Sequence, residues 1–296
     1  MKSKVLVLKS DGAAIYSDIV KVFDFYPHVL ERKPKKIAIK LNIGVIKPPE
    51  SGAIADPIFV ENLLRVLREK CGPEPEIAII EANSTNNRNV SICYKIMGFE
   101  AIAEKYGAKC VNLSDEPVVK KKIDGYLFKE IEVPKIMTET DLLITLPKLK
   151  THYLAKITGG LKNQFGCYPT KDKYKFHDKL SQAIVDANLM RKPDFALLDA
   201  INCMVGPGSL AGMTKKCNLI IASDDVVAAD CVGAKLFGFN PRFVGHIRKA
   251  AAKGLGSTKY SLHGDLKEIT PVDAEFDRFT FYVLEKLRNF GRKIMN

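Results

Sequence analysis

A short lysine-rich segment, residues 146–179, concentrates the side chains that could do chemistry in this chain. It carries eight lysines, two of the five histidines and two acids, so eight positive and two negative charges give it +6, half of the net +12 of all 296 residues. Ammonium groups gathered beside a glycine pair can hold a carboxylate or a phosphate, and a neutral imidazole can move a proton at the held ligand. The segment therefore predicts a site for an anionic ligand.

The start of this segment reads Lys-Leu-Lys-Thr-His, residues 148–152. If it is extended, the period of two places Lys148, Lys150 and His152 on one face. Lys150 and His152 would then lie roughly 6 to 7 Å apart, close enough for lysine to clamp an anion while histidine acts as acid or base. The alternative is an edge strand that its lysines protect against aggregation.

A glycine pair, Gly159-Gly160, follows, with Lys162 and Asn163 directly after it. Glycines let backbone N–H groups approach a ligand closely, and the two polar side chains could then orient it. The spacing is not that of a Walker phosphate loop. An ordinary glycine turn is an equal alternative.

Two further titratable residues occupy notable positions. His177 comes just before a predicted helix, 178–191, whose positive N-terminal end would keep the imidazole neutral and suited to act as a base. An exposed capping histidine is the alternative. Asp230 falls on the apolar stripe of another predicted helix, so its carboxylate needs a partner, and we favour pairing with a lysine or backbone groups over catalysis.

The elements that must position these residues alternate along the chain. Short β-branched runs and stretches of helical periodicity follow one another, which is typical of an α/β fold, and the near-continuous apolar strands favour a mainly parallel sheet with helices on both faces. At 296 residues and 46% hydrophobic composition, residues 1–296 can form one domain or two lobes with a cleft between. The predicted strands are 4–9, 36–42, 76–81, 109–113, 141–146, 194–199 and 217–222, and the predicted helices are 15–27, 57–70, 92–106, 178–191, 224–237, 242–254 and 277–293.

Two stretches interrupt the alternation. Residues 117–135 predict a small β-hairpin with a type I′ turn at Asp124-Gly125. Residues 147–177 show little periodicity, and connections of this length inside a domain are usually functional or disordered, so we expect this one to line the main cleft.

Polar residues follow the ends of several predicted strands. In an open parallel sheet the ligand lies outside the carboxyl ends of the strands, so these residues would share one rim. Three of them are carboxylates that could hold a divalent metal ion. Ser223 or Asp224 could equally serve as a helix N-cap. The rim residues are Lys40, Asn42, Glu81, Asn83, Ser84, Lys148, Asp199, Ser223 and Asp224, of which Glu81, Asp199 and Asp224 are the candidate metal ligands.

The bulk composition limits the class of protein. No apolar run approaches the roughly 18 to 20 residues that cross a bilayer, so we expect a soluble, cytoplasmic protein without a membrane partner. The seven cysteines form no C-x-x-C pair and no ferredoxin-type run, so the sequence spells out neither a zinc ribbon nor an iron–sulfur motif. A pI near 9.2 permits nucleic-acid binding, but lysine outnumbers arginine 36 to 10 and no aromatic-basic motif appears. High lysine and glutamate content is also typical of heat-adapted proteins.

The residues resemble a known family, the one catalogued as domain of unknown function 362. The resemblance is closest in Leu146-Pro147-Lys148-Leu149-Lys150-Thr151-His152 and Leu161-Lys162-Asn163-Gln164-Phe165-Gly166, and it continues in Ile39-Lys40-Leu41-Asn42, around Asp199 and Gly206-Pro207, in 222–230 and in 252–256. It covers nearly the whole chain but implies no settled reaction. Many relatives carry a ferredoxin-like iron–sulfur segment, which this chain lacks.

Three functions fit these observations. The first is an enzyme that acts on a small anionic metabolite, a carboxylate or a phosphate, through lysine clamping and histidine acid/base chemistry. The second is a redox-associated or cofactor-handling protein that works with a separate ferredoxin-like, iron–sulfur partner. The third is a basic nucleic-acid-binding module. For the first, the catalytic candidates are His152, His177 and Lys150, and the anion-binding candidates are Lys40, Asn42, Lys148, Gly159, Gly160, Lys162 and Asn163.

Overall fold

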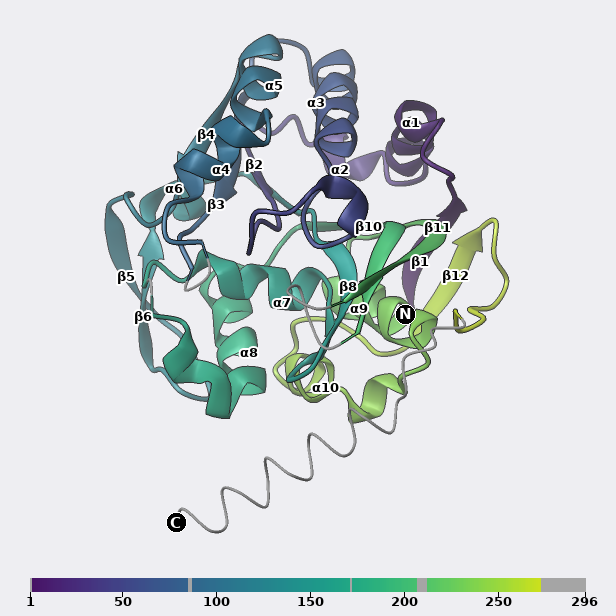
Figure 1. Ribbon diagram of the computed structural model, residues 1–296. Coiled ribbons are helices and arrows are strands. Elements are labelled where there is room, and N and C mark those ends of the chain that lie inside the picture. Colours follow the sequence, from purple (N-terminus) through teal and green to yellow (C-terminus); the bar gives the residue numbers. More distant parts are fainter. Residues whose placement is uncertain (1, 85–86, 171, 207–211, 273–296) are drawn as a thin grey trace.

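A computed structural model describes residues 2–84, 87–170, 172–206 and 212–272 of the chain (Figure 1). Most strands join one twisted sheet in the order β12-β1-β11-β10-β7-β2-β3-β4, and β8 and β9 extend it beside β10. The described strands are β1 (Ser3–Lys9), β2 (Lys36–Lys40), β3 (Glu76–Glu81), β4 (Ala108–Asn112), β5 (Val118–Lys122), β6 (Glu130–Pro134), β7 (Leu142–Thr145), β8 (Lys148–His152), β9 (Lys156–Thr158), β10 (Phe195–Val205), β11 (Met213–Ser223) and β12 (Tyr260–Gly264).

Helices cover both faces of this sheet, as Figure 1 shows. The predicted helix 277–293 lies outside the described residues. The described helices are α1 (Ile15–Phe25), α2 (His28–Glu31), α3 (Pro57–Cys71), α4 (Val90–Ile96), α5 (Phe99–Lys105), α6 (Lys135–Glu139), α7 (Gly160–Gln164), α8 (Leu180–Met190), α9 (Val226–Leu236) and α10 (Gly245–Ala252), with 3-10 turns η1 (Pro49–Ser51), η2 (Phe165–Cys167), η3 (Tyr174–Lys179) and η4 (Pro241–Phe243).

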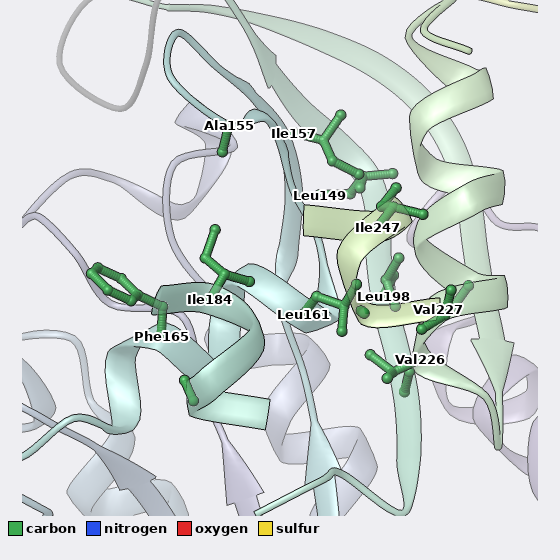
Figure 2. Close-up of a cluster of buried hydrophobic side chains, with 14 of the residues drawn as sticks. Leu149, Ala155, Ile157, Leu161, Phe165, Ile184, Leu198, Val226, Val227 and Ile247 are labelled. Carbon is green, nitrogen blue, oxygen red and sulfur yellow. The ribbon is translucent and has the colours of Figure 1, made fainter. Parts of the chain in front are cut away.

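The alternation of strand side chains builds two apolar layers. On β2, Ile37 and Ile39 join the layer beneath α1, α3, α4 and α5, whereas Ala38 belongs to the layer beneath α7 to α10. Figure 2 shows part of the second layer, where Leu149 of β8 and Leu161 of α7 lie in one cluster with side chains of α9 and α10. Burial on both faces explains why the strands read as continuous apolar runs.

The predicted α/β fold is confirmed. Strands β2, β3 and β10, which overlap the predicted 36–42, 76–81 and 194–199, share the sheet, and the β2–β3, β2–β7, β3–β4 and β7–β10 pairs are all parallel. Strand β11, by contrast, pairs antiparallel with both β1 and β10. Its carboxyl end therefore lies at the opposite edge of the sheet from those of β2, β3 and β7.

The hairpin is confirmed, but its type I′ turn is wrong. Strands β5 and β6 pair antiparallel, yet residues 123–129 connect them, and neither Asp124 nor Gly125 has the positive φ that a type I′ turn requires. The carboxylate of Asp186 on α8 holds the loop instead. It accepts hydrogen bonds from the N–H groups of Tyr126, Leu127 and Phe128 at 2.7, 2.7 and 3.1 Å. A tertiary contact thus replaces the local turn.

Two other expectations about local structure need correction. Residues 147–177 are not an irregular connection, because β8, β9, α7, η2 and the first part of η3 lie within them. The predicted helix 92–106 is two helices, α4 and α5, since Gly98 between them adopts the left-handed conformation with φ of 76°. Within the described ranges, no helix is both long and apolar enough to cross a bilayer.

Candidate functional site

Five lysines converge where β2, β3 and β7 reach their carboxyl ends and β8 continues beside β10. Four have their side chains at least 95% buried, and Lys162 is half-buried. Each of Lys150, Lys162 and Lys173 lies close enough to another of these lysines for its pKa to be lowered by that charge. We call this group the lysine cluster, and its members are Lys40, Lys148, Lys150, Lys162 and Lys173.

Lys40, at the end of β2, is saturated by partners. Its ammonium group contacts Glu81 of β3 at 2.7 Å and donates to the carbonyl oxygen of Leu41 at 2.7 Å and to Asn163 Oδ1 at 3.5 Å. Glu81 also accepts from the N–H groups of Ile43 and Ala82. An ammonium group has three hydrogens to donate, so Lys40 has none left for a ligand. The structure therefore gives Lys40 the role of a structural ion-pair partner.

Lys148 makes the second ion pair of the cluster. The register of β8 on β10 sets Lys148 opposite Asp199, and the ammonium and carboxylate groups lie 2.6 Å apart with both residues at most 2% exposed. Burial raises the pKa of Asp199, and the neighbouring charge of Lys148 opposes that rise. Asp199 does not end its strand as predicted, because β10 runs on to Val205. It still lies near the carboxyl edge because β7, beside it, stops at Thr145.

The other three lysines have no carboxylate partner among the described residues. Lys150 donates to the carbonyl oxygen of Ala53, and Lys173 to those of Asn83 and Gly166 at 2.7 and 2.8 Å. Lys162 has no hydrogen-bond or ion-pair partner within the described part of the chain. Burial, followed by the charge of Lys162, lowers the pKa of Lys150 to about 7, and burial lowers those of Lys162 and Lys173 to about 8.

His152 ends β8, so the predicted extended conformation of 148–152 is confirmed, and β8 is flanked by both β10 and β9. Its Nδ1 accepts from the N–H groups of Leu154 and Ala155 at 3.2 and 3.3 Å. An accepting nitrogen carries no proton, so the neutral ring holds its proton on Nε2. Burial, with the charges of Lys162 and Lys150, lowers the pKa of His152 well below 6.5. In this tautomer His152 is a hydrogen-bond donor and not a general base.

His177 does not lie at the start of a helix as predicted. It sits inside η3, and α8 begins only at Leu180, so the dipole argument for its pKa fails. Its ring packs 4.2 Å from that of Tyr174, and its charge contributes to the lowered pKa of His152. His177 therefore lies close enough to His152 for its charge to lower the pKa of that residue.

The glycine pair could offer its backbone to a ligand or form an ordinary turn, and in the structure the N–H of Gly160 is used within the protein. The N–H groups of Gly160 and Leu161 donate to the carboxylate of Asp230 on α9 at 2.7 and 3.1 Å. A Cβ at Gly159 would lie 2.3 Å from Asp230 Oδ1, and one at Gly160 would lie 2.6 Å from a methyl group of Val226. The glycines thus permit close packing of α7 on α9, and Asp230 pairs with backbone groups as we favoured.

Asn163 and Asn42 differ in whether their side-chain amide groups still have a hydrogen-bonding atom available for a ligand. The amide nitrogen of Asn163 donates to the carbonyl oxygen of Lys40 and to Thr145 Oγ1 at 2.9 and 3.0 Å, so both its hydrogens are used within the protein. The predicted role of Asn163 as a donor to a ligand therefore fails. By contrast, Oδ1 of Asn42 and Nε2 of Gln164 are buried with no hydrogen-bond partner among the described residues.

The three predicted metal ligands do not converge. Asp224 lies at the opposite edge of the sheet, where it pairs with His28 at 3.2 Å, because β11 runs antiparallel. Glu81 and Asp199 each face a lysine. No group of three or more His, Cys, Asp or Glu side chains suited to a metal occurs within the described ranges. The N-cap of α9 is Asp225, rather than Ser223 or Asp224.

Sequence reasoning missed two residues of the site. Lys173 stands among the alternating lysines 171–175 and carries no local sign that it alone would be buried. Gly166 packs directly over the Lys40–Glu81 pair, since a Cβ there would lie 2.8 Å from both Lys40 Nζ and Glu81 Oε1. Its place in the motif 161–166 was visible, but the need for a glycine was not.

Comparisons with known proteins assign the family. The family model described as "Domain of unknown function (DUF362)" matches residues 37–235. The chain belongs to this family. It is 30% identical over 146 residues to the thylakoid-associated protein sll1697 of Synechocystis sp., a match that covers 47% of the chain and 46% of the relative. The match thus spans about half the length of that DUF362 relative.

A solved structure also resembles the chain. The lactate racemase apoprotein from Thermoanaerobacterium thermosaccharolyticum aligns with a TM-score of 0.46 and 14% sequence identity, over 79% of this chain and 57% of that one.

Proposed function

We propose that this DUF362 member is an enzyme that binds a small carboxylate or phosphate metabolite at the lysine cluster. The observation that carries the proposal is the imbalance of charge there, since five lysines face only two carboxylates, Glu81 and Asp199. An ammonium group buried without a counter-ion costs several kcal/mol or loses its proton. A bound anion would supply the missing charge and favour the protonated state of the lysine that holds it.

Each side chain near the lysines that lack a carboxylate partner has a separate role in this proposal. Lys150 and Lys162 hold the anion, because their ammonium groups retain hydrogens that no carboxylate of the protein accepts. His152 offers its Nε2–H to an oxygen on which negative charge develops, as a neutral imidazole can. Asn42 Oδ1 is left to accept a hydrogen bond from the ligand.

The burial of the lysines argues against a nucleic-acid track in this segment. Lys148, Lys150 and Lys173 are at most 5% exposed, so a polyphosphate backbone running over the surface would not reach their ammonium groups. A small ligand that enters the site is a better match.

A thermal-shift screen tests the proposal. Phosphate, nucleotides and short carboxylic acids are added to the full chain, and at a concentration 100 times its Kd a ligand stabilises the folded state by about 2.7 kcal/mol. Lys150→Met and Lys162→Met proteins should lose most of that shift. Lys122→Met, which removes an exposed lysine on β5, is the matched control and should keep it. Stabilisation that is equal in all four proteins would remove the lysine cluster from the binding site.

A further inference from the structure

The backbone of Lys162 is held firmly although its side chain is only half-buried. It lies on α7 between two buried neighbours: Leu161 packs in the apolar layer of Figure 2, and Asn163 is bonded to Lys40 and Thr145. Asp230 fixes the start of the same helix through two backbone N–H groups. The backbone of Lys162 is therefore fixed on both sides, as a reacting group requires.

The amine of Lys162 is also free to react. No partner among the described residues occupies it, and the side chain is not closed off from solvent. Burial and the charge of Lys40 lower its pKa to about 8, so a sizeable fraction of the amine is neutral near pH 7.5. A neutral lysine amine beside other cations is the usual form of an amine nucleophile in enzymes.

The other lysines of the cluster lack this combination. Lys40 and Lys148 are closed into ion pairs, and Lys173 donates to two carbonyl oxygens. Lys150 has a lower pKa, about 7, but it is 3% exposed and bonded to Ala53. Lys150 is too enclosed to attack, and a carboxylate bound against it would raise its pKa and keep it protonated, so it is the better group to hold a negative charge.

We infer that Lys162 is a covalent nucleophile that forms an imine with the carbonyl carbon of a 2-oxo acid, whose carboxylate Lys150 holds. This inference rests on the proposed function and names its substrate class. A carboxylate beside a ketone suits the site because one ammonium group can bind the anion while a neighbouring amine reaches the adjacent carbon. His152 lies within the field of both lysines and carries a proton on Nε2.

The step balances without an oxidant or reductant. The lone pair of Lys162 Nζ forms a C–N bond to the carbonyl carbon while the C=O π bond breaks, and a proton moves from nitrogen to oxygen to give a carbinolamine. A proton from solvent, which reaches the half-buried Lys162, then joins the hydroxyl group, which leaves as water while the Nε2–H of His152 donates a hydrogen bond to the departing oxygen, and the C=N bond of a protonated imine forms. The protonated imine withdraws electrons from the neighbouring carbon.

Reductive trapping tests the inference. The full chain is incubated with pyruvate or 2-oxoglutarate and sodium cyanoborohydride, which converts an imine into a stable secondary amine. Intact mass should rise by one adduct, and peptide mapping should place it on Lys162. Lys162→Arg keeps the positive charge but forms no imine, so it should lose the adduct and keep part of the thermal stabilisation by the oxo acid. Lys122→Arg should behave as the parent.

The outcomes distinguish failure of Lys162 as a nucleophile from failure of the lysine cluster as an anion-binding site. Stabilisation by oxo acids without an adduct, or an equal adduct in the Lys162→Arg protein, overturns the nucleophile and leaves the anion site standing. Mapping of the adduct to Lys150 in the parent protein also overturns it. Absence of both stabilisation and adduct, for every anion in the screen, overturns the proposed function and this inference together.

Discussion

Replacement of Lys150 by methionine should stabilise the ligand-free protein at pH 6 and weaken its binding of anions. Methionine has similar length and no charge, so the change removes the ammonium group from a site where the side chain is 3% exposed. It also leaves the carbonyl oxygen of Ala53 without its donor. The two effects oppose each other, and their relative size depends on pH.

The magnitude follows from the pKa of Lys150, about 7 when folded against an ordinary 10.5. A base whose pKa is lowered on folding destabilises the folded state fully below the folded pKa, and the penalty fades as pH rises toward 10.5. At roughly 1.4 kcal/mol per pH unit, the penalty is about 5 kcal/mol at pH 6 and about 2 kcal/mol at pH 9. The lost hydrogen bond to Ala53 costs about 1–3 kcal/mol at either pH. The net gain for Lys150→Met is therefore about 2–4 kcal/mol at pH 6 and near zero at pH 9.

Urea unfolding of the parent and Lys150→Met proteins at both pH values measures this difference. The quantity that matters is the change in the free energy of unfolding between pH 6 and pH 9, because the hydrogen-bond and packing terms cancel in it. A difference of about 3 kcal/mol is expected. If the variant differs from the parent by the same amount at the two pH values, Lys150 titrates in the folded protein as it does in the unfolded chain, and the account of the site is refuted.

Three further variants test other parts of the structure. Lys148→Met leaves Asp199 buried without its partner and should lower the free energy of unfolding in urea by about 3–5 kcal/mol. A second change, Asp199→Asn, removes the unpaired charge and should recover part of the lost stability. Gly159→Ala places a methyl group against Asp230 and should lower stability by about 1–3 kcal/mol, measured by calorimetry; an unchanged melting temperature would contradict the close packing. His152→Asn keeps a short acceptor for the turn but lacks the Nε2–H. It should therefore fold and yet lower turnover by about 10²- to 10³-fold once an activity is known, the loss expected when one donor to a developing negative charge is removed, and full turnover would exclude this role for the histidine.

The frame of the sheet could be predicted because its signal is local. Strands β2, β3 and β7 are buried on both faces, so each reads as a continuous apolar run that no exposed strand or helix of that length would show. The direction of β11 could not be predicted, because an apolar strand reads the same in either direction. That single unknown moved Asp224 from the expected rim to the opposite edge.

The sequence predicted which lysines lie together but not which partners they have, and their role as a binding site stays a prediction. Lys148, Lys150 and Lys162 do lie together near the carboxyl ends of the strands, as their spacing and the rule for parallel sheets suggested. The partner of the glycine pair could not be seen, because Asp230 lies some 70 residues away along the chain. A lysine that ends in an ion pair and one that does not are identical in sequence.

Whether a lysine faces a carboxylate of the protein determines whether its ammonium group is available to bind an anion. Lys40 and Lys148 each face a carboxylate across the sheet, and a buried pair of this kind roughly cancels its own cost of desolvation. Lys150 and Lys162 have no such compensation, so each weakens the ligand-free fold in proportion to its lowered pKa. Proteins retain destabilising residues where function requires them. A bound anion supplies the negative charge that no carboxylate of the protein places beside these two lysines. The free energy by which they destabilise the ligand-free protein therefore becomes available for binding the anion.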